Sequence, residues 1–202
     1  MSRRGAAPLI LASSSPRRRR LLSHFGVDFT VKVPAVDESL LPNEDPVAHV
    51  RRLAQAKAAK VAAEAEEGLV VGADTIVVLD GEIIGKPEDR EDAIRMLSAL
   101  AGRTHRVYTG VAVTALPSGA TRTIVVCSRV TMAPIGEAEI RRYVEGGEPL
   151  DKAGAYAVQG EGKKYVTEVR GSFTNVVGLP LRALHRLLLH FDLPVSLPEI
   201  RL

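Results

Sequence analysis

The sequence predicts an α/β protein in which helices flank a mixed β-sheet. Segments with helical periodicity and segments with strand periodicity interleave irregularly along the chain. Two long runs rich in β-branched residues, 105–116 and 121–133, surround the turn sequence PSGA and predict one antiparallel pair. An irregular order of elements that contains such a pair favours a three-layer domain around a sheet of mixed direction.

Capping residues, prolines and glycines set the expected bounds of the other elements. Ser15 and Asp45 each precede a proline that suits the first helical position, and Gly26 and Gly102 suit helix ends. The predicted helices span 16–25, 45–65, 87–102, 136–147 and 179–191. The remaining predicted strands span 9–12, 28–33, two segments within 68–85 around Asp80-Gly81, 156–160 and 164–169.

Composition indicates an ordinary soluble globular protein. The chain has 202 residues, 46% hydrophobic and 25% charged, enough for one large domain or two small lobes. The net charge is only +3, aromatic residues make up 4% and tryptophan is absent, which argues against a nucleic-acid partner. No apolar run approaches the ~18 residues of a membrane span, so we expect no membrane partner.

The chain ends and the single cysteine give expectations about organisation and compartment. The start MSRRGAAP has no apolar stretch typical of a secretory signal, so residues 1–8 are predicted to be a flexible tail before a single domain at 9–202. Cys127 alone cannot form an internal disulfide framework and fits a reducing, cytoplasmic location.

Four consecutive arginines begin the first predicted helix, and helical spacing divides them. Arg18 lies three and four residues before Leu21 and Leu22 and shares their apolar face, whereas Arg20 points away. Arg17 lies at the edge of the inner face, and Arg19 is intermediate. Inward cations at a helix start, next to Ser13 and Ser15, favour a bound phosphate; the alternative is a basic helix start whose charges reach water.

Two further charged residues interrupt apolar patterns. Lys57 lies in the middle of the apolar stripe of the 45–65 helix, either as a snorkelling residue near the helix end or as a cation directed into a cleft. Asp74 interrupts the run LVVGADTIVVL, where Gly72 and Thr75 suggest a close-packed bend that carries a working carboxylate; a structural carboxylate is the alternative. Lys86 lies in a Gly-Lys-Pro turn, where most lysines are merely solvated.

Several cations and one carboxylate of this kind suit phosphoryl chemistry. Cations neutralise phosphate oxygens, an acidic residue holds a divalent metal, and a base orients water. Neither the pattern GxxxxGK[ST] nor GxGxxG is present, so the motifs indicate neither a P-loop protein nor a dinucleotide-binding fold.

Five sequence blocks follow one another along the chain: LASSSPRR (11–18), GADTIVVLDGEIIGKPED (72–89), HRVYTGVAV (105–113), DKAGAYAVQG (151–160) and GSFTNVVGLPL (171–181). In this order they resemble the motifs of the Maf family of nucleoside triphosphate pyrophosphatases. The resemblance covers about residues 9–190. It implies an elongated, twisted mixed sheet with a deep cleft, as in the Maf and inosine-triphosphatase group.

The resemblance also implies a reaction and its requirements. It implies hydrolysis of a nucleoside triphosphate to the monophosphate and pyrophosphate, with a divalent cation (Mg²⁺, Mn²⁺ or Co²⁺), by a protein that forms a homodimer. The residues that match catalytic positions are Asp74, Lys57, Lys86 and Glu38, of which Asp74 and Glu38 would hold the metal. Those that match substrate-binding positions are Ser13, Ser15, Arg17, Arg18, Thr75 and Gln159.

The motif variants indicate a substrate class. Arg17, the sequence Ala73-Asp74-Thr75 and Gln159 resemble the branch that acts on dTTP and UTP, and a glutamine amide can pair with the imide edge of thymine or uracil. Two alternatives remain: a pyrophosphatase for 7-methyl-GTP, and a nucleotide-binding regulator of cell division without turnover.

Overall fold

The computed structural model describes residues 7–198 and divides them between two compact units. The first consists of the described parts of Met1–Asp74, Thr109–Val126 and Gly178–Leu202, and the second of Thr75–Tyr108 and Cys127–Val177. Of the predicted tail, residues 1–6 lie outside the described residues, whereas Ala7 and Pro8 are exposed and have no regular structure.

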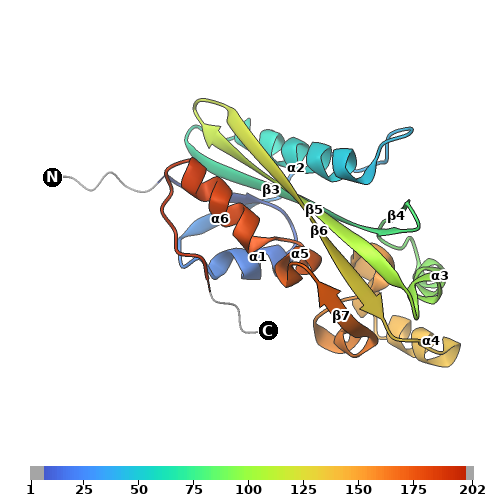
Figure 1. Cartoon of the computed structure of the whole chain (residues 1–202). Helices are drawn as coiled ribbons and strands as arrows, with labels where there is room; N and C mark the ends of the chain where they lie inside the picture. The colour runs from blue at the N-terminus through green and yellow to red at the C-terminus, as the bar shows by residue number, and fades with distance from the viewer. Residues whose placement is uncertain (1–6, 199–202) are drawn as a thin grey trace. The chain divides into compact units, whose positions relative to one another are not determined.

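Within residues 7–198, seven strands form one sheet of mixed direction (Figure 1). They are β1 (Leu9–Ala12), β2 (Phe29–Lys32), β3 (Gly68–Leu79), β4 (Glu82–Ile84), β5 (Thr104–Leu116), β6 (Ala120–Met132) and β7 (Val166–Arg170). The strand order is β2-β1-β3-β5-β6-β7, with β4 paired to β3. Strand β1 runs parallel to β2 and β3, while β4 and β7 are antiparallel to their neighbours, which confirms the predicted mixed sheet flanked by helices.

The helices follow the expected segments with some shortening at their ends. They are α1 (Pro16–Ser23), α2 (Pro46–Ala62), α3 (Arg90–Leu100), α4 (Glu137–Glu145), α5 (Phe173–Val177) and α6 (Leu181–His190), together with the 3-10 turns η1 (Glu148–Asp151), η2 (Ala153–Ala155) and η3 (Gly160–Tyr165). Ser15 and Asp45 cap α1 and α2 as predicted, because their side-chain oxygens accept first-turn backbone N–H groups.

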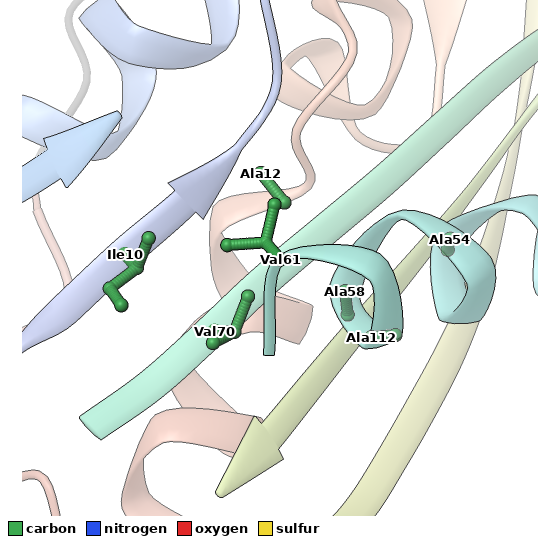
Figure 2. Close-up of a cluster of buried hydrophobic side chains, with 7 residues drawn as sticks. All are labelled: Ile10, Ala12, Ala54, Ala58, Val61, Val70 and Ala112. Atoms are coloured by element: carbon green, nitrogen blue, oxygen red, sulfur yellow. The ribbon is translucent and has the colours of Figure 1, made fainter. Parts of the chain in front are cut away.

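In the first unit, α2 packs on one face of the sheet through small side chains. Figure 2 shows this cluster, whose members are Ile10, Ala12, Ala54, Ala58, Val61, Val70 and Ala112. Leu9 and Leu11 alternate to the opposite face of β1 and are also buried. Helices α1 and α6 are neighbours on that side (Figure 1), and the Phe25 and His185 rings stack with centroids 6.4 Å apart.

Two glycines let α2 approach the sheet backbone to backbone. A Cβ added at Gly72 of β3 would lie 2.2 Å from the Ala54 carbonyl oxygen, and one added at Gly110 of β5 would lie 2.3 Å from the Val50 carbonyl oxygen. No real Cβ tolerates such distances to backbone atoms. The close packing predicted around Gly72 is therefore confirmed, and its cause is the contact with α2.

We expect Gly72→Ala to reduce the free energy of unfolding by about 1–3 kcal/mol, because the added methyl group displaces α2. Urea unfolding followed by circular dichroism measures the change. Gly85→Ala is the matched control, since a Cβ there meets nothing within 4 Å, and it should stay within about 0.5 kcal/mol of the parent. Equal effects of the two substitutions would contradict the packing argument.

The second unit differs from the prediction in one segment. Residues 156–160 were expected to form a strand, but residues 156–159 lie between η2 and η3, Gly160 begins η3, and none of them joins the sheet. The alternation in YAVQG predicted a strand, but positive φ angles at Gly154 and Gly160 (72° and 71°) turn the chain on both sides of this segment. The short helix α5 was not predicted.

A buried histidine lies in the core of the second unit. His105 of β5 is 2% exposed, and its Nε2 lies 2.7 Å from the hydroxyl oxygen of Tyr156. Its Nδ1 has no hydrogen-bond partner among the described residues. Burial lowers the pKa of His105 to about 4, so the folded protein holds this ring neutral at neutral pH.

We expect His105 to make folding stability depend on pH in mildly acidic solution. The unfolded chain takes up a proton near pH 6.5 and the folded chain only near pH 4, so this contribution is complete above pH 6.5 and is lost as the pH falls. Between pH 7 and pH 5 the free energy of unfolding should fall by about 2 kcal/mol more in the parent than in His105→Gln. Urea titrations at the two pH values measure this difference, and parallel pH profiles would rule the contribution out.

Candidate functional site

A buried ammonium group bridges two carboxylates in the first unit. Lys57 Nζ on α2 donates to Asp74 Oδ1 at 2.7 Å and forms an ion pair with Glu38 Oε1 at 2.7 Å. Lys57 and Asp74 are each 5% exposed, whereas the side chain of Glu38 is 48% exposed. The pair thus lies at the inner end of a polar cluster that opens to solvent at Glu38.

The position of Lys57 decides between the two alternatives that the sequence left open. Its stem follows the apolar stripe of α2 between Ala54 and Val61, both fully or almost fully buried. A snorkelling lysine would carry its ammonium to water, but this one turns inward to the carboxylate on β3. The snorkelling alternative is therefore wrong, because the ammonium of Lys57 lies buried against the Asp74 carboxylate.

Asp74 is not at a bend, contrary to the prediction. It lies within the continuous strand β3, flanked by buried Ala73 and half-buried Thr75. A carboxylate there is tolerated because a charged partner is in hydrogen-bond contact. The predicted bend is absent, because a tertiary ion pair compensates for the charge of Asp74 within the strand.

A second ion-pair network fastens the loop that carries Glu38. Glu44 accepts hydrogen bonds from Arg52 Nε and Nη2 at 2.6 and 2.7 Å, and Arg52 Nη2 also donates to the Ser39 carbonyl oxygen at 3.0 Å. His49 Nδ1 lies 2.8 Å from Glu44. The hydrogen bond from Arg52 is the main reason that the pKa of Glu44 falls to about 2, although burial opposes it. The backbone next to Glu38 is thereby tied to α2.

The start of α1 supplies a second polar group. Ser13 is 5% exposed, and its Oγ accepts from the Ser15 backbone N–H at 3.2 Å and from Arg18 Nη1 at 3.4 Å. Ser15 Oγ in turn accepts from the Arg18 backbone N–H. Arg18 Nε donates to the Gly178 carbonyl oxygen at 2.8 Å, which orients the guanidinium from its far side.

The four arginines differ in exposure as predicted. Arg17 and Arg18 are half-buried, whereas Arg19 and Arg20 are exposed. Burial lowers the pKa of Arg18, while the charges of Asp74 and Glu38 act to raise it. Arg18 therefore belongs to the same electrostatic cluster as the Lys57 bridge, with two cations set against two carboxylates.

The remaining predicted site residues belong to the second unit. Thr75 directly follows Asp74 on β3. Lys86 is exposed in the turn after β4, before buried Pro87, and Gln159 is exposed between η2 and η3. The structure brings Ser13, Ser15, Arg18, Glu38, Lys57 and Asp74 into one cluster within the first unit.

Sequence reasoning missed the residues that support the cluster. The sequence indicates the pair of Glu44 and Arg52 only weakly. Glu44 directly precedes the helix cap Asp45, and an acidic side chain there can reach the second turn of α2. The Gly178 carbonyl carries none, since it lies 160 residues from Arg18 in the chain.

The donor set tests whether a metal suits this site. Among the described residues, no group of three or more His, Cys, Asp and Glu side chains could hold an ion by itself. Magnesium often uses only one or two carboxylates and takes its other ligands from water and phosphate oxygens. Asp74 and Glu38, which meet at one ammonium group, fit that second kind of site.

The fold resembles that of a known class of α/β proteins. The structure resembles that of the Staphylococcus aureus Ham1 protein, with a TM-score of 0.52 and 16% identity over 92% of this chain and 99% of that one. At this identity the likeness concerns the fold alone. The chain is thus an α/β protein of the Ham1 fold type with a buried cluster of cations and carboxylates.

The chain belongs to the Maf family, because the family described as Maf-like protein matches residues 8–191. A dTTP/UTP pyrophosphatase of Moorella thermoacetica is 48% identical over 93% of this chain and 96% of its own length. One of Anaeromyxobacter dehalogenans is 50% identical over 94% of this chain and 97% of its own. A third, from Dictyoglomus turgidum, is 50% identical over 91% and 95%.

No helix in residues 7–198 combines the length and the apolar character that crossing a membrane requires.

We expect single arginine substitutions at the start of α1 to differ in their effect on anion binding. Arg17→Ala and Arg18→Ala should each weaken the binding of inorganic triphosphate about tenfold or more, because each removes a charge-assisted contact. Arg20→Ala should change the dissociation constant less than twofold, since its side chain is solvated. Isothermal titration calorimetry at fixed ionic strength measures all three. Similar losses in all variants would show that only total charge matters.

Proposed function

We propose that this protein is a dTTP/UTP pyrophosphatase that releases the nucleoside monophosphate and pyrophosphate. The observation that carries the proposal is the buried Lys57 ammonium between Asp74 and Glu38, whose charges act on Arg18 at the serine-arginine start of α1. The names of relatives about 50% identical over nearly the whole chain support the same reaction.

The phosphate chain would be held by cations and hydroxyl groups. In this proposal Arg17 and Arg18 contact the phosphate oxygens from the start of α1, together with Ser13 and Ser15. The role of Lys86 as a further cation stays a prediction from the family resemblance. These groups stabilise the negative charge that develops on the departing pyrophosphate.

Asp74 is proposed as the base. A carboxylate oxygen of Asp74 accepts a proton from water as the water oxygen bonds to the α-phosphorus, and the bond from that phosphorus to the α-β bridging oxygen breaks. Lys57 holds Asp74 in place through its 2.7 Å contact and offers positive charge to the phosphates. One water molecule and one triphosphate thus give one monophosphate and one pyrophosphate.

A divalent cation such as Mg²⁺, Mn²⁺ or Co²⁺ is part of the proposal, and Asp74 and Glu38 would hold it. When bound, such an ion neutralises phosphate oxygens and polarises the phosphoryl group. The charges of the site support this part of the proposal: Lys57 and Arg18 already face Asp74 and Glu38, so they leave little net positive charge for a triphosphate.

Gln159 is proposed as the residue that recognises the base. Gln159 would pair with the imide edge of thymine or uracil through its amide, with Thr75 as a further substrate contact. We also propose a single catalytic domain at 9–202, a homodimer and a cytoplasmic location, with no nucleic-acid or membrane partner.

We expect Asp74→Asn to remain folded and to lower pyrophosphate release from dTTP by at least about 100-fold, because the amide cannot accept the proton. Asp28→Asn, at an exposed position of the same unit, is the matched control and should retain parental activity. A coupled pyrophosphate assay with Mg²⁺ and Mn²⁺ measures both. Near-parental release by Asp74→Asn would remove this residue from the mechanism.

The same assay tests the proposed substrate. The parent protein should release pyrophosphate from dTTP and UTP faster than from 7-methyl-GTP and dATP. A preference for 7-methyl-GTP would replace the proposal with the modified-guanosine activity. Tight binding of UTP without release would replace it with a regulatory role.

A further inference from the structure

Gln159 lies in a short loop of the second unit that is fastened on both sides. The loop consists of residues 157–162 and is called the glutamine loop below. Backbone N–H groups on both sides of Gln159 donate to side chains of α4 and η1, whereas Gln159 itself is exposed. Such a loop can hold one side chain in a defined position at its apex.

The first tie is made by a tyrosine hydroxyl. Tyr143 of α4 is 3% exposed and packs edge-on against Tyr165, with ring centroids 5.2 Å apart. Its hydroxyl accepts from the Ala157 backbone N–H at 3.3 Å and donates to Glu148 Oε1 at 2.7 Å. The position two residues before Gln159 is therefore fixed from α4.

The second tie is made by a carboxylate. Glu148, the first residue of η1, accepts the Glu161 backbone N–H on Oε2 and the Gly162 backbone N–H on Oε1, both at 3.0 Å. These bonds hold the chain two and three residues after Gln159. Together with the Tyr143 hydroxyl, one carboxylate thus connects both sides of the glutamine loop.

The backbone of the glutamine loop lies close to the Glu148 carboxylate and the Tyr143 hydroxyl. A Cβ added at Gly160 would lie 2.4 Å from Glu148 Oε2, and one added at Gly162 would lie 2.4 Å from the Tyr143 hydroxyl oxygen. Glycine at both positions is what allows the backbone to reach the two polar atoms.

The protonation states of Tyr143 and Glu148 favour a strong hydrogen bond between them. Burial opposes ionisation of Glu148, but hydrogen bonds from Tyr143 and the two loop N–H groups lower its pKa below the ordinary value. Burial, followed by the contact with Glu148, raises the pKa of Tyr143. At neutral pH a phenol therefore donates to a carboxylate, which is a charge-assisted bond.

We propose that Glu148 and Tyr143 are positioning residues for base discrimination, which they exert by fixing the glutamine loop and hence Gln159. This rests on the proposed function, in which Gln159 contacts the base. Neither residue touches the phosphates in that proposal, so their effect should appear in the choice between bases.

A merely structural role is the alternative, and it has a different kinetic consequence. Loss of folded enzyme lowers kcat/KM for every nucleotide by the same factor. Loss of loop position lowers kcat/KM for dTTP more than for dATP, which does not present the imide edge. The ratio of the two kcat/KM values does not depend on the concentration of active enzyme, so it separates the two roles.

The experiment measures this ratio in Tyr143→Phe, which keeps the ring and removes the hydroxyl, and in Glu148→Gln, which keeps the size and removes one acceptor. We expect the ratio to fall about tenfold in each variant. Glu145→Gln is the matched control: it removes a carboxylate from an exposed position of α4 and should leave the ratio unchanged.

A double-mutant cycle tests whether the effect passes through Gln159. Gln159→Ala should lower the ratio by itself, and adding Tyr143→Phe to it should lower the ratio no further. If Tyr143→Phe and Glu148→Gln keep the parental ratio while Gln159→Ala loses it, the positioning role is wrong and the proposed function stands.

The two remaining outcomes are equally decisive. A parent that cleaves dTTP and dATP equally well overturns base reading by Gln159 and with it this inference. A parent that releases no pyrophosphate from dTTP or UTP overturns the proposed function itself.

Discussion

The contact of the Lys57 ammonium with Asp74 is the interaction on which the site depends. Removing two charges from water costs several kcal/mol for each ion unless good geometry and further partners compensate. Here Glu38 supplies a second carboxylate to the same ammonium, and the cluster opens to solvent on that side. Truncating Lys57 would remove the cation that the buried Asp74 carboxylate contacts, so stability and site geometry are coupled at this point.

Packing determines that this contact can form. The backbone of α2 lies directly on β3 because Gly72 has no side chain and the contacting residues of α2 are mostly alanines. Lys57 stands one turn after Ala54 and next to Ala58, so the same close approach that buries these alanines brings its ammonium within 2.7 Å of the strand. The small residues of the first unit therefore pack the core and also allow the contact between Lys57 and Asp74.

In the second unit, the constraint is that the exposed side chain of Gln159 must be held in position without being buried. The glutamine loop has no regular strand or helix on the N-terminal side of Gln159, so its backbone N–H groups need other acceptors. Glu148 and Tyr143 supply these acceptors, and the glycines at 160 and 162 make room for them. Rigidity at this loop thus comes from side-chain groups rather than from the sheet.

The sequence by itself determined the order and type of most elements, the caps of α1 and α2, and the division of the four arginines, because these depend on local periodicity and capping chemistry. Tertiary structure alone decided three matters. It turned Lys57 inward, since that depends on a carboxylate from another strand. It kept β3 continuous through Asp74, because the partner offsets the charge. It also left residues 156–159 without a strand, since backbone N–H groups of this segment and of Glu161 donate to side chains of α4 and η1, which outweighs a short alternation of apolar residues.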